Sequence, residues 1–191
     1  MSVGQREPTR RLFFALWPDA EARLALARAS RKAVRSCGGR PVPPENAHVT
    51  LAFLGSVAER RVAEVDAIGR NTASAFALAA PLTLSFGTLV HWARGEILAA
   101  VVDEEPQSLQ QLAAALKDAT AAAGFTPDLK PFRPHVTVAR KVAHRIAPSV
   151  LTGVTWCFDT FALVASRTTP AGSVYSVLES YLLVGEQKSR E

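Results

Sequence analysis

Two histidines with matching neighbours are the residues of this chain most suited to chemistry. His48 opens the stretch His-Val-Thr-Leu-Ala, and His135, 87 residues later, opens His-Val-Thr-Val-Ala. A neutral imidazole accepts a proton and a protonated one donates it, with an ordinary pKa of about 6.5. Two imidazoles that face one cleft can therefore act as general base and general acid in a single reaction.

Each histidine is followed two positions later by a threonine, Thr50 or Thr137. Residues i and i+2 of a β-strand lie on one face, so each stretch presents an imidazole beside a hydroxyl, with apolar residues on the other face. Threonine hydroxyls can donate hydrogen bonds to phosphate oxygens. This set suits a cyclic phosphodiester, whose hydrolysis removes one proton from water and gives one to the departing ribose oxygen.

The repetition favours a functional interpretation over a structural one. A single His-x-Thr strand is weakly informative, but two of the four histidines of this chain share the same flanking residues. The two copies also indicate a duplicated lobe, since each follows a proline-containing loop. His91 and His144 lack the pattern, and we expect the first to be peripheral and the second to be exposed.

A metal site is the main competing interpretation of the two histidines. Zinc sites generally use three or four His, Cys or carboxylate ligands, often in close pairs. Asn46 and Arg133 occupy the positions two residues before the histidines, and an arginine beside a ligand disfavours a cation. Cys37 and Cys157 have no metal-ligand spacing and are expected to be reduced. The sequence therefore predicts no metal and no cofactor.

Composition and charge indicate a globular protein with an anionic partner. The chain has 191 residues, of which 48% are hydrophobic and 20% charged, and this is enough to bury a core. Its net charge of +5 and pI of about 9.7 favour nucleic acid or phosphate. No stretch approaches the roughly 20 apolar residues of a membrane span, and the polar N-terminus lacks a signal-peptide core. We expect a cytoplasmic protein without membrane association or an obligate protein partner.

Periodicity and turn residues predict the elements that position the two histidines. Strands are expected over 12–17, 48–54, 82–90, 96–102, 135–139, 155–166 and 174–183, and helices over 20–36, 59–75 and from 106 to a stop at Gly124. Asp19 is the expected N-cap of the first helix. Its exposed face should carry Arg23, Arg28, Arg31, Lys32 and Arg35. The order predicts an α+β fold with antiparallel pairing, as one domain over 11–185 between flexible tails at 1–10 and 186–191.

In several stretches the chain resembles the RNA 2′,3′-cyclic phosphodiesterases of the two-histidine phosphoesterase superfamily, also called 2′-5′ RNA ligase-like proteins. These stretches are 11–18 (RLFFALWP), 42–55 (VPPENAHVTLAFLG), 131–140 (PFRPHVTVAR) and 166–175. Ala47 stands where the family commonly has leucine. The resemblance covers about residues 11–184. It implies two pseudo-symmetric lobes, whose antiparallel sheets flank a central cleft and whose helices pack on the outside.

The resemblance also implies a reaction and roles for the paired residues. The expected reaction is metal-independent hydrolysis of RNA 2′,3′-cyclic phosphate ends to 2′-phosphate, on RNA ends or small cyclic nucleotides. His48 would donate a proton to the leaving O3′, and His135 would accept one from the attacking water. Thr50 and Thr137 would hold the cyclic phosphate. The residues alone leave the two histidine roles interchangeable, because a symmetric pair can run in either direction.

Two further residues receive roles from the resemblance. Phe53 would stack on the terminal base, and Arg140 would supply positive charge to the phosphate. Each lies five residues after a histidine, which in a regular strand is the opposite face unless a bulge intervenes. The alternatives are therefore a core position for Phe53 and a merely exposed one for Arg140.

Three other functions remain open at this point. They are 2′-5′ RNA ligation, hydrolysis of another cyclic nucleotide phosphodiester, and a module that binds RNA ends without catalysis. The intact His-Thr pairs argue against binding alone, because arginine and lysine serve phosphate binding better than histidine and threonine.

Overall fold

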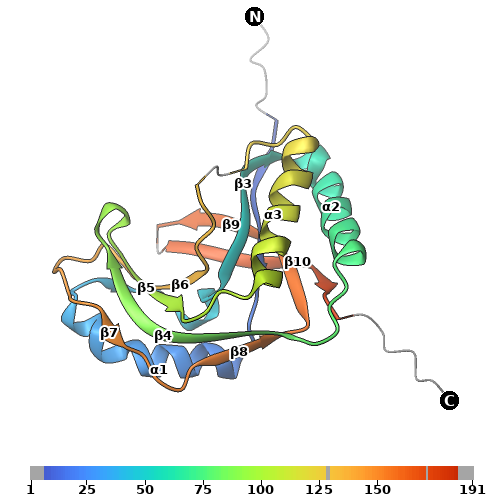
Figure 1. Ribbon diagram of the computed structural model, residues 1–191. Helices are drawn as coiled ribbons and strands as arrows, with labels where there is room; N and C mark the ends of the chain where they lie inside the picture. Colours follow the sequence, from blue (N-terminus) through green and yellow to red (C-terminus); the bar gives the residue numbers. More distant parts are fainter. Residues whose placement is uncertain (1–6, 128–129, 171, 185–191) are drawn as a thin grey trace, which may run out of the picture.

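The computed structural model describes residues 7–127, 130–170 and 172–184 and shows an α+β fold, as predicted. Within this part of the chain, two antiparallel sheets lie between the helices α1 (Ala20–Ser36), α2 (Val62–Ala75) and α3 (Gln107–Ala122) (Figure 1). None of the described helices is long and apolar enough to cross a membrane.

Each sheet carries one of the two histidines. The first has the order β10-β9-β1-β3 and consists of β1 (Thr9–Leu16), β3 (Val49–Ala58), β9 (Thr160–Thr169) and β10 (Gly172–Leu182). The second has the order β2-β6-β5-β4-β7, with β8 paired to β4. Its strands are β2 (Arg40–Pro41), β4 (Leu82–Trp92), β5 (Ile97–Val102), β6 (His135–Arg140), β7 (Ser149–Val150) and β8 (Thr155–Phe158). His48 immediately precedes β3, His135 begins β6, and these two strands contact each other.

Strand β1 is buried on both faces, which explains its continuous apolar run. Leu12, Phe14 and Leu16 belong to the main core, while Phe13 and Ala15 belong to a small cluster on the other face of the sheet. That second cluster is joined by Trp17, Phe53 and Tyr175. The face of the first sheet that carries the second cluster is therefore lined with aromatic side chains.

Helix α1 has the predicted bounds and the predicted cap. The Asp19 carboxylate accepts a hydrogen bond from the Ala22 amide at 2.7 Å, which satisfies a free N–H of the first turn. The chain leaves the helix through Gly38, whose φ of +61° is the left-handed conformation that glycine tolerates. Helix α1 contacts β6, the strand of His135.

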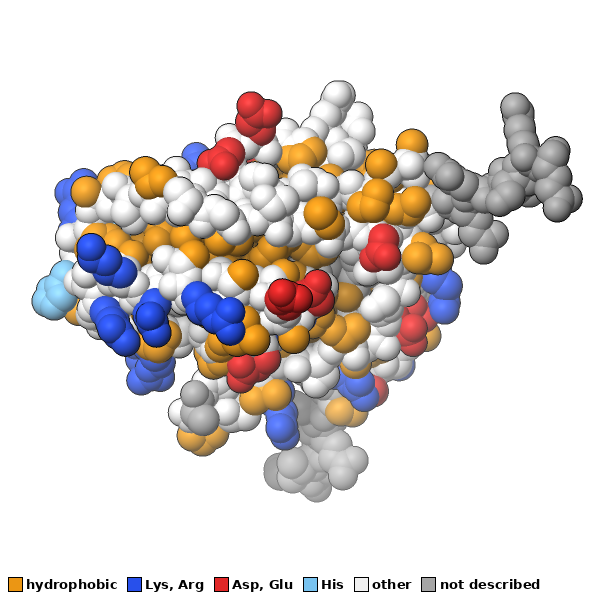
Figure 2. All heavy atoms as spheres, turned by 90° about the horizontal axis from the view of Figure 1, so that it is seen from below, with side chains coloured by type: hydrophobic (Ala, Val, Ile, Leu, Met, Phe, Trp, Pro, Cys, Tyr) orange, Lys and Arg blue, Asp and Glu red, His pale blue; other side chains and the backbone are white. Residues whose placement is uncertain are grey.

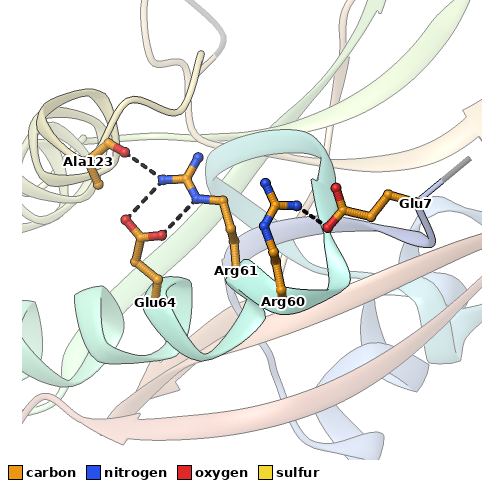
Figure 3. A network of polar contacts seen from close by, with 5 residues as sticks. All are labelled: Glu7, Arg60, Arg61, Glu64 and Ala123. Atoms are coloured by element: carbon orange, nitrogen blue, oxygen red, sulfur yellow. Dashed lines mark hydrogen bonds and ion pairs between the residues drawn. The ribbon is translucent and has the colours of Figure 1, made fainter.

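Helices α2 and α3 pack over the first sheet and are joined to each other by Arg61 (Figure 3). Its guanidinium donates to Glu64 and to the carbonyl of Ala123 at the end of α3, both at 2.7 Å. The same group lies 3.9 Å from the ring centroid of Phe125. Arg61 thus caps the end of α3 and forms an ion pair with a residue of α2. These contacts stabilise the packing of the two helices against each other.

Strands β3 and β6 contain the same irregularity at equivalent positions. In β3, Thr50 pairs with Ala15 but Ala52 pairs with Phe14, so Leu51 is an extra residue. In β6 the register shifts in the same way between Thr137 and Ala139, which makes Val138 the extra residue. A bulge of this kind reverses the alternation of the faces beyond it. Phe53 and Arg140 therefore lie on the same faces as the histidines that precede them.

The predicted end of the strand at Gly55 is wrong. Strand β3 continues to Ala58, and Gly55 pairs with Leu12 across a second register shift. Its φ of +73° explains the difference, because glycine readily takes the positive φ that a bulge requires. A glycine in an apolar stretch marked a bend of the strand and not its end.

The larger remaining differences from the sequence prediction concern the stretch 155–166 and the start of β1. The stretch 155–166 forms two strands in different sheets, because the chain turns at Asp159, whose carbonyl accepts from the Leu183 amide. Strand β1 begins at Thr9, inside the segment predicted as a tail, since Thr9 and Arg10 already pair with β3. The other predicted tail, 186–191, lies outside the described residues.

Candidate active site

A cavity of about 560 Å³ lies where the two sheets meet, and both His-Thr pairs open into it. Predicted site residues in its lining are His48, Thr50, His135, Thr137 and Arg140. The two lobes thus bring together, at one cavity, side chains that are 87 positions apart in the sequence.

The two imidazoles are held by the same backbone contact. His48 Nδ1 lies 2.7 Å from the carbonyl oxygen of Asn46, and His135 Nδ1 lies 2.7 Å from that of Arg133. A carbonyl only accepts, so each Nδ1 carries a hydrogen and donates it. The Nε2 of each neutral ring is consequently the proton acceptor, and it becomes a donor when the ring is protonated.

The environment of the cavity lowers the pKa of both histidines. Burial is the main cause and lowers the pKa of His48 to about 4; the Asn46 carbonyl opposes this, while the positive charge of Arg140 adds to it. Burial likewise lowers the pKa of His135, opposed by the Arg133 carbonyl and reinforced by Arg140. Both rings are therefore neutral at pH 7 in the free protein, and a bound anion would favour the imidazolium form by raising these pKa values.

Aromatic side chains surround His48 on several sides. Its ring centroid lies 4.9 Å from Phe13, 5.4 Å from the stacked ring of Trp17 and 5.2 Å from Tyr175 in an edge contact. The guanidinium of Arg23 lies 4.7 Å from the Trp17 ring centroid and donates to the Glu45 carbonyl at 3.1 Å. Arg23, expected on the exposed face of the first helix, is instead half-buried.

The second histidine has a sparser aromatic environment. His135 makes an edge contact with Trp92, with ring centroids 4.5 Å apart. His91, the neighbour of Trp92, does not line the cavity, and His144 is exposed, as predicted.

The structure separates the two residues that follow the bulges. Arg140 lines the cavity, and within the described part of the chain it has no ion-pair partner. Phe53 lies on the same sheet face as Phe13, with ring centroids 6.5 Å apart, and the Arg11 guanidinium lies 5.4 Å from its ring. Phe53 is not part of the cavity lining.

Several lining residues were missed by the sequence reasoning as site residues: Arg40, Asn46, Lys141, Ser173 and Tyr175. The Asn46 amide donates to the Ser173 carbonyl at 2.9 Å, which connects the segment before β3 to the hairpin of β9 and β10. The strand pair predicted from the family resemblance contained Tyr175, but nothing in its spacing placed it at the cleft. Among the described residues, no group of three or more His, Cys, Asp or Glu is arranged to hold a metal ion.

Comparison with known proteins places the chain in a family. The sequence profile of the 2′-5′ RNA ligase superfamily matches residues 17–169. This chain belongs to that superfamily. It is 35% identical over 187 residues to an RNA 2′,3′-cyclic phosphodiesterase of Thermus thermophilus, covering 92% of this chain and 91% of that protein. It is 30% identical over 177 residues to an RNA 2′,3′-cyclic phosphodiesterase of Escherichia coli, covering 91% of this chain and 97% of that one.

Solved structures of two other proteins share the fold along nearly the whole chain. Escherichia coli LigT complexed with 3′-AMP superposes with a TM-score of 0.82 at 26% identity, covering 93% of this chain and 100% of that one. TT0787 of Thermus thermophilus superposes with a TM-score of 0.77 at 33% identity, covering 92% of this chain and 99% of that one. The predicted family resemblance and the predicted α+β class are thereby confirmed.

Proposed function

We propose that this protein hydrolyses RNA 2′,3′-cyclic phosphate ends to 2′-phosphate ends, with His48 as the general acid and His135 as the general base. The observation that carries the proposal is the pair of imidazoles in one cavity, each with Nδ1 bound to a carbonyl two residues earlier. The relatives from Thermus thermophilus and Escherichia coli are named for this activity.

The reaction requires two proton transfers. Neutral His135 takes a proton through Nε2 from a water molecule, whose oxygen forms a bond to phosphorus. The bond between phosphorus and O3′ breaks, and O3′ receives the proton of His48 Nε2. The product has a 2′-phosphate and a 3′-hydroxyl, and one further proton transfer through solvent restores both rings.

Hydroxyl and guanidinium groups stabilise the charge of the phosphate during the reaction. Thr50 and Thr137 lie on the same strand faces as the histidines and line the same cavity. Their hydroxyls donate to the non-bridging oxygens, and the guanidinium of Arg140 adds a charged donor. Donors fixed before the reaction are effective where negative charge develops in the transition state.

Substrate binding itself favours protonation of the acid. Burial and the charge of Arg140 keep His48 neutral in the empty site. A bound phosphate places a negative charge against the ring, which raises its pKa, and the Asn46 carbonyl accepts from the Nδ1–H of the imidazolium. The anion that needs the proton of His48 therefore also increases the fraction of His48 that carries it.

Tyr175 is better placed than Phe53 to stack on the terminal base. Tyr175 lines the cavity and makes an edge contact with His48, while Phe53 lies beyond Phe13 and outside the lining. Aromatic stacking on a base is tolerant of sequence because every base has a π-face.

The first experiment is turnover of a short RNA that ends in a 2′,3′-cyclic phosphate, in EDTA, with the phosphate of the product located by NMR. The proposal expects a 2′-phosphate and no effect of EDTA. A 3′-phosphate product would contradict the assigned leaving group, and loss of turnover in EDTA would contradict catalysis without a metal. RNA with a 5′-hydroxyl, added to the same assay, tests 2′-5′ ligation, in which that hydroxyl replaces water as nucleophile.

A further inference from the structure

Positive charge is strongly segregated along this chain. Residues 22–44 contain six Lys and Arg, and residues 129–158 contain five, and neither segment contains an Asp or Glu. These two segments hold half of the 22 basic residues and none of the 17 acidic ones, so the rest of the chain is net acidic. The net charge of +5 thus understates how basic one part of the molecule is.

The fold brings the two basic segments together. Arg40 pairs with Arg140 across β2 and β6, and the amides of Ala143 and His144 both donate to the Cys37 carbonyl at 3.0 Å. The end of α1 therefore lies against the segment that follows β6. Figure 2, seen from the side of α1, shows Lys and Arg side chains gathered over one part of this face, next to a histidine.

This surface is continuous with the rim of the active site. Arg40 and Lys141 line the catalytic cavity. Arg31 shares a smaller cavity with Pro41 and Val42, which also line the catalytic one. Arg31 on the exposed side of α1 therefore lies at a cavity that shares lining residues with the catalytic one.

Four exposed cations of α1 form no ion pair with any other described residue. In the described part of the chain, ion pairs are formed by Arg10, Arg60, Arg61 and Arg70, all outside the two basic segments. Arg28, Arg31, Lys32 and Arg35 are exposed and form none. Like charges gathered on one face repel each other, and an anionic ligand relieves this repulsion.

We propose that Arg28, Arg31, Lys32 and Arg35, here called the basic surface, bind the phosphates of the RNA strand that leads to the cyclic end. This inference rests on the proposed function and extends it from the terminal nucleotide to a strand of several nucleotides. The apolar side of α1 is packed in the fold, and Leu24 is its exposed large apolar side chain, at 44%. A helix with four exposed cations and one exposed large apolar side chain suits a polyanion in solution better than a lipid surface.

The test compares two fourfold variants of equal charge. In the first, Arg28, Arg31, Lys32 and Arg35 are each changed to Gln; in the control, Arg10, Arg60, Arg70 and Lys117 are each changed to Gln. The substrates are cytidine 2′,3′-cyclic phosphate and an unstructured RNA of about twelve nucleotides with the same end. The first variant should lose about tenfold or more in kcat/KM on the long RNA at low salt and stay within about twofold on the mononucleotide. The control variant should lose neither activity.

Salt dependence gives a second readout. Each phosphate contact with a single strand contributes about 0.7 to the slope of log affinity against log salt, so four lost contacts reduce that slope by up to about 3. The proposal is overturned if the first variant has an unchanged kcat/KM on the long RNA, or if it loses equally on both substrates. The proposal is also overturned if the wild type binds phosphatidylserine vesicles, the first variant does not, and the two bind RNA equally. That result would assign the basic surface to membranes.

Binding alone separates this inference from the proposed reaction. If the wild type turns over neither substrate, the proposed function fails. Binding of the same RNA with a 2′-phosphate end, measured by fluorescence anisotropy, still tests the role of the basic surface. Weaker binding by the first variant than by the control supports it, and equal binding overturns it.

Discussion

The two lobes hold their histidines alike but surround them differently. Both rings donate from Nδ1 to a carbonyl two residues earlier, and in both strands a bulge follows the threonine. His48, however, is enclosed by Phe13, Trp17 and Tyr175, whereas His135 contacts Trp92. The contacts that orient a proton donor or acceptor are thus duplicated, and the packing around them is not.

The positions after the bulges show the same divergence. Phe53 and Arg140 are equivalent in the repeat, and both lie on the face of the preceding histidine. One is packed against an aromatic ring outside the cavity, and the other brings a positive charge into it. The same bulge therefore directs an apolar residue into packing in one lobe and a positive charge into the cavity in the other.

Removal of either imidazole should have the largest effect on activity. His48→Ala and His135→Ala should each lower kcat on a cyclic phosphate by about 10²- to 10⁴-fold, the usual value of one positioned proton transfer. His91→Ala is the control, because His91 does not line the cavity and should retain activity.

The same variants can distinguish the acid from the base. A diester with a nitrophenolate leaving group needs no proton on departure, so His48→Ala should lose far less on it than on the cyclic phosphate. His135→Ala should lose activity on both substrates. The reverse pattern would exchange the two roles, and equal losses on the nitrophenyl ester would remove the distinction between the lobes.

Arg140 is expected to matter next most. Hydrogen bonds to charged groups contribute about 1.5–3 kcal/mol, so Arg140→Gln should lower kcat/KM by roughly 10- to 100-fold. Arg133→Gln is a matched control, since Arg133 contacts His135 through its carbonyl and its side chain is outside the cavity lining. Similar losses in both variants would indicate that overall charge, and not the position after the bulge, is responsible.

The lowered pKa of both histidines predicts an acidic optimum. The reactive form of the free enzyme has one ring protonated and one neutral, so kcat/KM is highest between the two pKa values and falls above the higher one. Since burial lowers the pKa of His48 to about 4 and also lowers that of His135, the maximum should lie below pH 6.5. Above it, kcat/KM should fall by up to about tenfold per pH unit.

Arg140→Gln sharpens this prediction because the charge of Arg140 lowers the pKa of both rings. The variant should shift both limbs of the profile to higher pH, and a maximum above pH 7 in the wild type would contradict the argument. The free energy of unfolding, measured over the same pH range, should also depend on the pKa of His48. The unfolded chain protonates His48 first, so stability is complete above about pH 6.5 and declines as the pH falls towards 4.

Local signals in the sequence were enough to predict α1 and the strand positions of the two His-Thr pairs. The Asp19 cap, the helical spacing and the glycine stop are all contained within one segment, and so is each His-Thr pair. The bulges were not predictable, because a bulge is a property of the register between β3 and β1 or between β6 and β5. Apolar alternation alone could not decide the side on which Phe53 and Arg140 lie.

Long-range pairing also explains the other errors. The apolar stretch 155–166 continues through Asp159, where the chain leaves one sheet for the other, and no local residue pattern reports that change. Arg23 has the helical phase of an exposed residue, but Trp17 and Glu45 lie beside it in the fold. Tyr175 reaches the cavity through its pairing in the hairpin of β9 and β10.

Exchange of the aromatic neighbours should have a smaller effect. Aromatic pairs contribute about 0.5–1.5 kcal/mol beyond burial, so Trp17→Leu and Trp92→Leu should each cost roughly 2- to 10-fold in kcat. Trp17→Leu should also raise the pKa of His48, because a smaller side chain admits water to a ring whose pKa is low through burial. NMR titration of the two rings is the measurement. A shift of His135 in Trp17→Leu, with His48 unchanged, would contradict the contacts described.

Phe53→Leu should have the smallest effect, within about twofold in kcat/KM on a cyclic mononucleotide, because Phe53 packs on Phe13 outside the cavity lining. Tyr175→Leu is its positive control and should raise KM by about 5-fold or more, since stacking on a base is worth about 1–3 kcal/mol. The comparison is made on purine and pyrimidine substrates, as stacking is stronger for purines. If Phe53→Leu raises KM for purines as much as Tyr175→Leu does, the base extends past Phe13 to Phe53. The bulge of β3 would then place a substrate-binding residue, as the bulge of β6 places Arg140.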